Sequence, residues 1–254
     1  MRAFDLTGRV AVVTGGNGGI GLAMARGIAA CGADVVISGR NAEKAVGALA
    51  AIRELGVKAE FVAADVTQKS ECQKLIAESE RLFGRVDILV NNAGTSIRKM
   101  PQDYSEDEWR LVLDTNLTSA FLCSQAAYPA MVRAGGGKMI NIGSMMSLFG
   151  APYATPYASS KGGIVQMTRA LATAWAKDNI QVNAVLPGWI DTDLTVRARA
   201  QVPGLKESVE KRTPVGRWGE PPDMSGVAAF LATPASDFVT GTAIPVDGGF
   251  SIAM

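Results

Sequence analysis

The stretch VVTGGNGGIG (12–21) places five glycines directly after a short apolar run. The run RVAVVT (9–14) predicts a buried strand, and IGLAMARGIAACG (20–32) predicts a helix that ends at Gly32. Glycines between a strand and a helix permit a tight turn, and the free N–H groups at the start of the helix favour an anionic ligand. The stretch therefore predicts a phosphate-binding turn, with a plain connection between strand and helix as the alternative.

The residues that follow the glycines decide between two phosphate-binding motifs. A P-loop ends in Gly-Lys-Ser or Gly-Lys-Thr, whereas Leu22 and Ala23 follow the last glycine here, which excludes that motif. The glycines fit a dinucleotide fingerprint in two registers, G-x-G-x-x-G over 16–21 and T-G-x-x-x-G-x-G over 14–21. We therefore expect a dinucleotide at this turn, in one of the two registers.

Composition points to a globular chain without nucleic-acid or membrane partners. Hydrophobic residues make up 48% of the 254 residues and charged residues 19%, which is typical of a protein with a large core. We find no linker, so we expect one domain over 1–254. A net charge of +1 produces no field that attracts nucleic acid or an anionic membrane. MRAFDLTGRV (1–10) lacks the apolar stretch of a signal peptide, and we expect a cytoplasmic protein.

The cysteine and histidine content excludes several kinds of site. Cys31, Cys72 and Cys123 are isolated and odd in number, so we expect buried thiols rather than disulfides or a zinc cluster. The chain contains no histidine, which excludes a Ser-His-Asp triad, a His-ligated zinc and a histidine base. No metal site is predicted, and any proton transfer must use other groups.

The rest of the chain alternates short apolar runs with helical stretches. The runs are 33–38, 58–65, 86–94, 138–144, 180–188 and 241–247, and the helical stretches are 41–55, 68–83, 106–132, 156–177 and 222–231. This alternation predicts an α/β fold: a single doubly wound Rossmann-type domain with a seven-stranded parallel sheet and helices on both faces. Ligands of such folds bind at the carboxyl ends of the strands.

Several further motifs lie at the predicted strand ends. They are NNAG (91–94), the asparagine of DTNLTSAF (114–121), the serine of INIGSMMS (140–147), YASSK (157–161) and PG (187–188). With the glycine turn, this ordered set resembles the classical short-chain dehydrogenase/reductase family over essentially the whole chain. An arginine after NNAG and the run RTPVGRWGEP (212–221) make it most similar to the gluconate 5-dehydrogenase and 2-deoxygluconate 3-dehydrogenase branch.

The resemblance implies a set of site residues. It selects the second glycine register and implies a catalytic tetrad of Asn116, Ser144, Tyr157 and Lys161. It implies cofactor contacts from Gly15, Asn17, Gly19, Ile20, Gly21, Arg40, Asn41, Asp65, Val66, Asn92, Ala93, Gly94, Tyr157, Lys161, Pro187, Gly188, Ile190 and Thr192, with Asp65 and Val66 facing the adenine. The residues expected to contact substrate are Ser96, Arg98, Ser144, Met146, Tyr157 and Trp189.

The tetrad residues suit proton transfer at a secondary alcohol or ketone. Tyr157 and Lys161 are four apart on a predicted helix, so they share a face, and an ammonium beside a phenol lowers the pKa of the phenol. We expect Tyr157 to act as general acid and base, and Ser144 to hold the substrate oxygen. The resemblance implies that Lys161 also binds the nicotinamide ribose and that Asn116 keeps a water in line with the lysine.

The second predicted strand suggests which nicotinamide cofactor binds. NAD sites usually carry an acidic residue there, whereas this strand ends in Gly39 and Arg40. An arginine suits the 2′-phosphate of NADP, so we expect NADP, with NAD as the alternative. In the alternative reading, Arg40 is a solvated charge that stacks on the adenine.

Substrate choice depends on the loops after the strands. The polar segment 188–221 predicts a mobile substrate lid, and Arg98 predicts a sugar-acid carboxylate, as in gluconate or ketogluconate. The alternatives are a solvated Arg98, a 3-oxoacyl-carrier-protein reductase, and a cofactor-sensing scaffold without activity. The resemblance also implies a homotetramer, with Trp109 and Phe121 in the core or in an interface.

Overall fold

The strands of the computed structural model, which describes residues 2–253, form one parallel sheet. They are β1 (Val10–Thr14), β2 (Asp34–Gly39), β3 (Ala59–Ala63), β4 (Ile88–Asn91), β5 (Gly137–Ile142), β6 (Ile180–Pro187) and β7 (Ala243–Val246). The sheet has seven strands in the order β3-β2-β1-β4-β5-β6-β7, and each neighbouring pair is parallel. The predicted fold class is confirmed, and the order reverses between β1 and β4, where ligands bind in doubly wound sheets.

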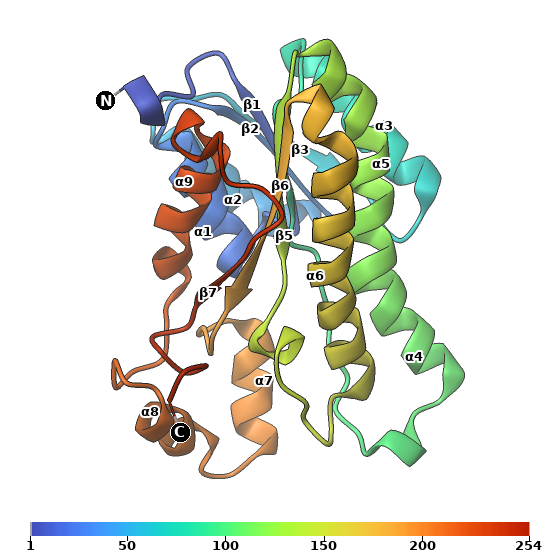
Figure 1. Cartoon of the computed structure of the whole chain (residues 1–254), viewed down its shortest axis with the longest axis vertical. Helices are drawn as coiled ribbons and strands as arrows, with labels where there is room; N and C mark the ends of the chain where they lie inside the picture. Colours follow the sequence, from blue (N-terminus) through green and yellow to red (C-terminus); the bar gives the residue numbers. More distant parts are fainter. Residues whose placement is uncertain (1, 254) are drawn as a thin grey trace.

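Helices cover both faces of this sheet. They are α1 (Gly19–Ala29), α2 (Ala42–Arg53), α3 (Lys69–Phe83), α4 (Glu106–Leu113), α5 (Ser119–Arg133), α6 (Thr155–Trp175), α7 (Asp193–Gln201), α8 (Leu205–Arg212) and α9 (Ser225–Ala232). Successive strand residues face opposite sides: Val13 packs with α1, α2 and α9, whereas Val12 packs with α3, α5 and α6. Figure 1 shows these two helical layers on either side of the strands.

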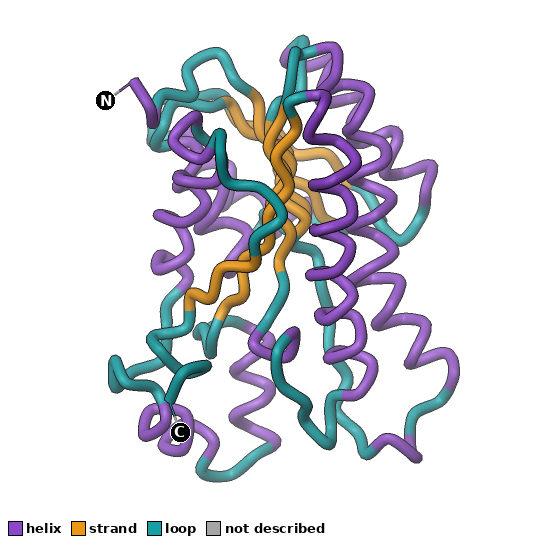
Figure 2. Tube along the Cα trace, in the orientation of Figure 1, coloured by secondary structure: helices purple, strands orange, loops and turns teal. Residues whose placement is uncertain are grey.

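Two predicted segments differ from the structure. The predicted helix 106–132 is divided into α4 and α5 by a π-helical turn, Asp114–Thr118, whose Asn116 side chain bonds outside the helix. The segment 188–221, predicted as a polar loop, contains α7 and α8 around a small cluster of its own, which includes Leu205, Val209 and Trp218. Figure 2 shows α7 and α8 beyond one end of the sheet, close to the C-terminal end of the chain.

The predicted cysteine and aromatic environments are only partly correct. Cys72 and Cys123 are buried free thiols whose sulfurs lie 3.5 Å apart, as expected, but Cys31 is only half-buried. Trp109 is 39% and Phe121 43% exposed, so neither is a core residue of this chain. Val112 is the buried residue of α4, and the buried residues of α5 include Cys123 and Ala127, so Trp109 and Phe121 lie outside the buried faces of their helices.

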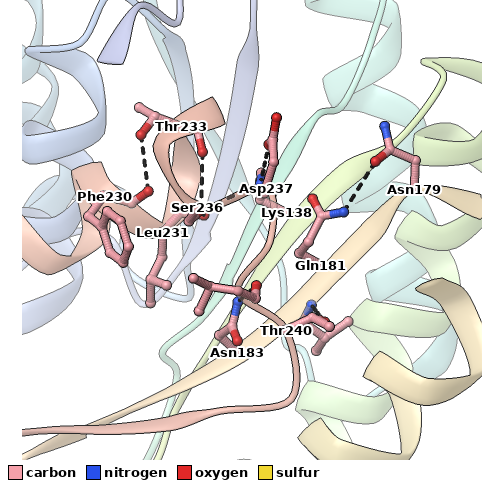
Figure 3. A network of polar contacts seen from close by, with 12 residues as sticks. Lys138, Asn179, Gln181, Asn183, Phe230, Leu231, Thr233, Ser236, Asp237 and Thr240 are labelled. Carbon is pink, nitrogen blue, oxygen red and sulfur yellow. Dashed lines mark hydrogen bonds and ion pairs between the residues drawn. The ribbon is translucent and has the colours of Figure 1, made fainter. Parts of the chain in front are cut away.

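The amino ends of the strands are held by paired polar groups. Lys138, buried at the start of β5, donates to Asp237 at 2.7 Å and lies 3.4 Å from the Ser236 hydroxyl. Asn183 donates to the Val239 carbonyl at 2.8 Å. Figure 3 shows how these contacts fasten the segment before β7 to β5 and β6.

Asp87 forms a second charged group at the same edge. Its buried carboxylate accepts hydrogen bonds from Arg9 at 2.8 Å, from Arg85 at 2.6 and 2.7 Å, and from the Val10 N–H at 3.0 Å. A cavity of about 210 Å³ lies here, lined in part by Arg9, Asp87 and Lys138. The charges around this cavity are therefore neutralised within the chain.

Within residues 2–253, no helix is long and apolar enough to cross a membrane. The same residues contain no group of three or more acidic or cysteine side chains placed to hold a metal ion.

Candidate active site

The glycine turn between β1 and α1 confines several of its residues. Gly15 and Gly19 have φ values of +64° and +50°, a region that favours glycine. A Cβ on Gly21 would lie 2.3 Å from the Gly15 carbonyl oxygen and 2.4 Å from the Asn92 amide nitrogen, and a Cβ on Gly16 would lie 2.7 Å from the Ile37 side chain. Gly15, Gly19 and Gly21 are the glycines of the T-G-x-x-x-G-x-G register. Gly18, the N-cap of α1, supplies no side chain, so no side-chain hydrogen bond caps the first N–H groups of the helix.

Asn92 fastens the turn after β4 to the glycine turn. Its amide donates to the carbonyls of Thr14 and Gly15 at 3.0 and 3.1 Å. The Thr14 hydroxyl in turn accepts from the N–H groups of Asn92 and Ala93 at 3.0 and 3.1 Å. The resemblance implies that Asn92 and Ala93 contact the cofactor, and the structure shows that they hold the two turns together.

The turn after β2 lies against the glycine turn. The Ser38 carbonyl accepts from Gly15 N–H at 2.7 Å, and the Asn17 amide donates to the Asn41 carbonyl at 3.3 Å. The Asn41 side chain caps α2, so it is already engaged. Among the described residues, none forms a hydrogen bond or ion pair with the exposed Arg40 side chain. Its guanidinium is therefore available to an anion.

Other predicted cofactor residues differ in what they can offer. The Asp65 carboxylate accepts two hydrogen bonds from Thr67, and Val66 is buried. Ile190 is 3% exposed within the main core, so only its backbone can reach a ligand. The hydroxyl of Thr192 lies 3.4 Å from that of Thr195, in the cap of α7. Ile20 is the second residue of α1, Pro187 is the last residue of β6, and Gly188 follows it.

Ser144, Tyr157 and Lys161 meet at the carboxyl end of β5. Ser144 begins a 3-10 turn, and the neighbouring Ser147 fixes it by accepting from the Ser144 N–H and donating to the Lys161 carbonyl at 2.7 Å. The Lys161 ammonium lies 5.6 Å from the centre of the Tyr157 ring and donates to the Ile142 carbonyl at 2.7 Å. Three predicted tetrad members are thus brought together.

The expected lowering of the Tyr157 pKa by Lys161 is not seen in the structure. Burial raises the pKa of Tyr157, while a hydrogen bond with Ser144 and the charge of Arg98 oppose that rise. Burial also lowers the pKa of Lys161 to about 8. The lysine ammonium is turned to the Ile142 carbonyl, so Arg98 is the cation that acts on the phenol.

Asn116, the fourth tetrad member, lies in the π-helical turn and is 2% exposed. Its side chain accepts from the Thr95 N–H at 2.7 Å and donates to the Thr95 carbonyl at 2.9 Å and the Ser160 hydroxyl at 3.1 Å. A Cβ on Gly94 would lie 3.4 Å from the Asn116 oxygen and 3.8 Å from the Lys161 nitrogen. Asn116 therefore ties the loop after β4 to α6, close to Lys161. π-helical turns are frequent at functional sites.

A cavity of about 370 Å³ opens beside Ser144 and Tyr157. All six residues predicted to contact substrate line it: Ser96, Arg98, Ser144, Met146, Tyr157 and Trp189. Gly188, predicted as a cofactor contact, also lines it, and the residues that sequence reasoning did not single out are Ile97, Met145, Ala151, Tyr153, Ala154, Leu194, Thr195, Ala198 and Gln201. Four of these missed residues belong to α7, which had no clear apolar periodicity to reveal it.

Arg98 is a half-buried cation in this cavity. Its guanidinium lies 4.9 Å from the centre of the Tyr153 ring and 6.0 Å from that of Trp189, and its Nη1 is buried without a hydrogen-bond partner among the described residues. A buried donor nitrogen without a partner is costly, which favours an acceptor supplied by a bound molecule. Lys99 instead pairs with Glu108 outside the cavity.

Tyr104 supports the loop that carries Arg98, and no motif had indicated it. Its hydroxyl donates to the Ile97 carbonyl at 2.7 Å and accepts from the Lys99 N–H at 3.2 Å. Because these bonds bracket Arg98 in the chain, they fix the backbone on both sides of the guanidinium.

Known proteins similar to this chain are dehydrogenases and reductases. A family model described as enoyl-(acyl carrier protein) reductase matches residues 15–251. The chain is 38% identical over 251 residues to gluconate 5-dehydrogenase of Gluconobacter oxydans, covering 99% of this chain and 98% of the relative. It is 41% identical over 251 residues to 2-dehydro-3-deoxy-D-gluconate 5-dehydrogenase of Escherichia coli, covering 98% of each. A crystal structure of gluconate 5-dehydrogenase from Burkholderia cenocepacia in complex with NADP and tartrate matches with a TM-score of 0.94 and 40% identity, covering 100% of this chain and 99% of that chain.

Proposed function

Because the chain belongs to the short-chain dehydrogenase/reductase family, we propose that it is an NADP(H)-preferring oxidoreductase of sugar acids. As a family member it is an NAD(P)-dependent enzyme acting on CH–OH groups. The substrate we propose is a sugar acid such as gluconate or ketogluconate, which is oxidised or reduced at a secondary alcohol or ketone. The relatives named for gluconate and ketogluconate chemistry support this choice.

The observation that carries the substrate class is the unpaired guanidinium of Arg98. It shares a cavity with Ser144 and Tyr157, so a molecule there can place a carboxylate on Arg98 and a carbonyl or hydroxyl at the two oxygens. A carboxylate would give Nη1 the partner that it lacks, through a charge-assisted hydrogen bond. A neutral ketone would leave the guanidinium unpaired.

The tetrad supports a specific division of work. Bound NADP(H) supplies or accepts the hydride. Ser144 Oγ holds the substrate oxygen. The Tyr157 phenol gives that oxygen a proton during reduction, and the Tyr157 phenolate takes the proton of the alcohol during oxidation. Since burial raises the pKa of Tyr157, its phenol is protonated at neutral pH, which suits reduction. Lys161, with a pKa of about 8, can pass a proton onward near neutral pH.

The residues at the glycine turn fit an NADP molecule. The uncapped start of α1 suits a pyrophosphate, and the unpaired Arg40 suits a 2′-phosphate. NAD remains the alternative cofactor. Arg40→Asp should therefore shift preference from NADP toward NAD, measured as the ratio of kcat/KM values for the two cofactors. An unchanged ratio would leave Arg40 as a solvated charge.

The test follows reduced-nicotinamide absorbance while the enzyme meets keto and hydroxy sugar acids, neutral polyols, simple ketones and 3-oxoacyl thioesters. We expect turnover of a sugar acid, and Arg98→Gln should raise its KM by about tenfold or more, the loss of one hydrogen bond to a charged group. The KM of a neutral ketone should be unchanged, because it forms no carboxylate pair with Arg98, whereas its kcat can change because Arg98 also acts on the Tyr157 phenol. Arg110→Gln, which breaks an exposed pair with Glu106, is the matched control.

Other outcomes of the panel point elsewhere. Turnover confined to 3-oxoacyl thioesters would favour the carrier-protein reductase, which would use the same tetrad. No hydride transfer with any substrate would favour a cofactor-sensing scaffold. A KM for the sugar acid that Arg98→Gln leaves unchanged would contradict the carboxylate pairing.

Two further predictions concern assembly and location. We propose a cytoplasmic homotetramer with 188–221 as a substrate lid. Exposed apolar side chains support assembly: Trp109, Phe121, Phe238 and Ile252 are 39%, 43%, 104% and 85% exposed in the single chain. Sedimentation over a range of concentrations tests it, and a monomer at every concentration would contradict it.

A further inference from the structure

The side chain of Lys44 on α2 lies between the glycine turn and the start of the proposed lid. Its ammonium lies 3.4 Å, and its Cε 3.1 Å, from the position that a Cβ on Gly18 would occupy. The same ammonium pairs with the Asp193 carboxylate at 2.7 Å. Gly18 belongs to the glycine turn, whereas Asp193 begins α7. One side chain therefore contacts the turn that suits the cofactor and the first helix of the proposed lid.

A second contact brings the same two segments together. A Cβ on Gly19 would lie 3.3 Å from the Thr192 methyl group, so the start of α7 rests on the glycine turn. The residues 192 and 193 thus cover one side of this turn. Displacing them moves the beginning of the lid.

Lys44 lies beside the residues that suit a 2′-phosphate. Its backbone N–H donates to the Asn41 side chain at 2.9 Å, and the Asn41 carbonyl accepts from Asn17 of the glycine turn at 3.3 Å. Arg40 immediately precedes this group. Asn17 and Gly18 add no positive charge to the glycine turn, and Lys44 brings an ammonium to that place.

The pair with Asp193 is of a kind that a phosphate can displace. The side chains of Lys44 and Asp193 are 50% and 80% exposed, and exposed ion pairs contribute little. A phosphate dianion carries more charge and offers three acceptor oxygens. It would also repel the Asp193 carboxylate at this short range.

We propose that Lys44 exchanges Asp193 for the 2′-phosphate of the cofactor, and thereby both selects NADP and releases the start of the lid. This inference rests on the proposed NADP preference. It assigns Lys44 as a second cation beside Arg40 and makes the Lys44–Asp193 pair the link between cofactor and lid.

The binding test uses two fragments without a nicotinamide, 2′,5′-ADP and 5′-AMP, titrated by calorimetry. Lys44→Gln should weaken binding of 2′,5′-ADP about tenfold, as expected for the loss of one hydrogen bond to a charged group, and leave the affinity for 5′-AMP unchanged. Asp193→Asn should strengthen binding of 2′,5′-ADP about twofold, because the Lys44 ammonium loses a competing carboxylate. Lys74→Gln, which breaks an exposed pair with Glu71 on α3, is the control and should change neither fragment.

The lid test is hydrogen exchange of the amides of α7. In the wild type, exchange should be faster with saturating 2′,5′-ADP than with saturating 5′-AMP, and Lys44→Gln should abolish that difference. Equal weakening of both fragments, no weakening, or the same exchange with both fragments would overturn the proposal.

The outcomes separate this inference from the proposed function. A wild type that binds both fragments equally overturns the NADP preference together with the role of Lys44. A wild type that prefers 2′,5′-ADP but turns over no sugar acid overturns only the substrate class. If the wild type prefers 2′,5′-ADP and turns over a sugar acid, but Lys44→Gln binds 2′,5′-ADP as tightly as the wild type, only the inference about Lys44 is overturned.

Discussion

The charged side chains at the two edges of the sheet differ in whether they are paired with opposite charges. At the amino edge, around a cavity of about 210 Å³, Asp87 is held by Arg9 and Arg85, and Lys138 by Asp237. Each of these charged groups therefore forms an ion pair within the chain. Since a buried charge is stable only when it is paired, they serve to hold strands and connecting segments in register.

At the carboxyl edge, around a cavity of about 370 Å³, the cations lack such partners. Arg98 keeps a buried nitrogen without an acceptor, and Lys161 has a backbone carbonyl in place of a carboxylate. The difference between the edges shows where the chain has left interactions for another molecule. Two cavities of one sheet can thus be told apart by the pairing of their charges.

The largest expected effect is that of Tyr157→Phe at the carboxyl edge. Loss of a general acid should lower kcat about 1,000-fold, equivalent to about 4 kcal/mol in the barrier. Folding should be preserved, because the ring remains. Steady-state turnover measures kcat, and urea denaturation measures the free energy of unfolding. Tyr128→Phe, which removes a hydroxyl bonded to Asp178 at 2.9 Å, is the matched control. A fall of less than tenfold would remove Tyr157 from the proton transfer.

The next effect concerns the buried charge of Lys161. Its pKa falls from 10.5 to about 8 on folding, so between these values the unfolded chain binds more protons and the free energy of unfolding rises with pH. Deprotonation of the buried ammonium should therefore raise the free energy of unfolding by about 3 kcal/mol between pH 8 and pH 10.5. Urea denaturation from pH 7.5 to 10.5 measures it, and Lys161→Met should flatten the curve. Parallel curves for both proteins would contradict the burial of this ammonium.

At the amino edge, Asp87→Asn should cost stability without changing catalysis. Removing one member of a buried pair usually costs several kcal/mol, but Arg9 and Arg85 are partly exposed, so we expect about 2 kcal/mol. Urea denaturation measures the loss. The kcat and KM values per folded molecule should be unchanged, and a changed KM would show that this cavity also takes part in binding.

The smallest effect should come from Asp237→Asn. The Asp237 side chain is 66% exposed, and Lys138 keeps the Ser236 hydroxyl, so we expect a loss of at most about 1 kcal/mol. The same urea measurement applies. A loss as large as that of Asp87→Asn would mean that the buried Lys138 depends on this carboxylate more than the exposure indicates.

Local patterns were sufficient for the sheet and the glycine turn. The apolar runs of β1 to β7 are short and separated by helical stretches. Gly15 and Gly19 have positive φ values, which favour glycine, and a Cβ on Gly21 would clash with the Gly15 carbonyl. Such features depend on neighbours in the chain. The resemblance then supplied the order of Asn116, Ser144, Tyr157 and Lys161, which periodicity alone does not single out.

What was missed depends on contacts between distant residues. The π-helical turn at 114–118 continues the helical pattern on both sides, and only the bonds of Asn116 to Thr95 and Ser160 reveal it. The guanidinium of Arg98 lies beside the rings of Tyr153 and Trp189, which lie far along the chain. α7 and α8 are too polar to be recognised by themselves and depend on packing around Trp218.

That small cluster in 188–221 has an evolutionary consequence. Its members Ala198, Leu205, Val209 and Trp218 come from within the segment, whereas Ile190 near the start of the segment belongs to the main core. Part of the packing that holds α7 and α8 is thus local, and α7 lines one side of the 370 Å³ cavity. Substitutions within this local packing can reshape that side of the cavity without touching the strands, so we expect substrate range to change there first as the sequence diverges.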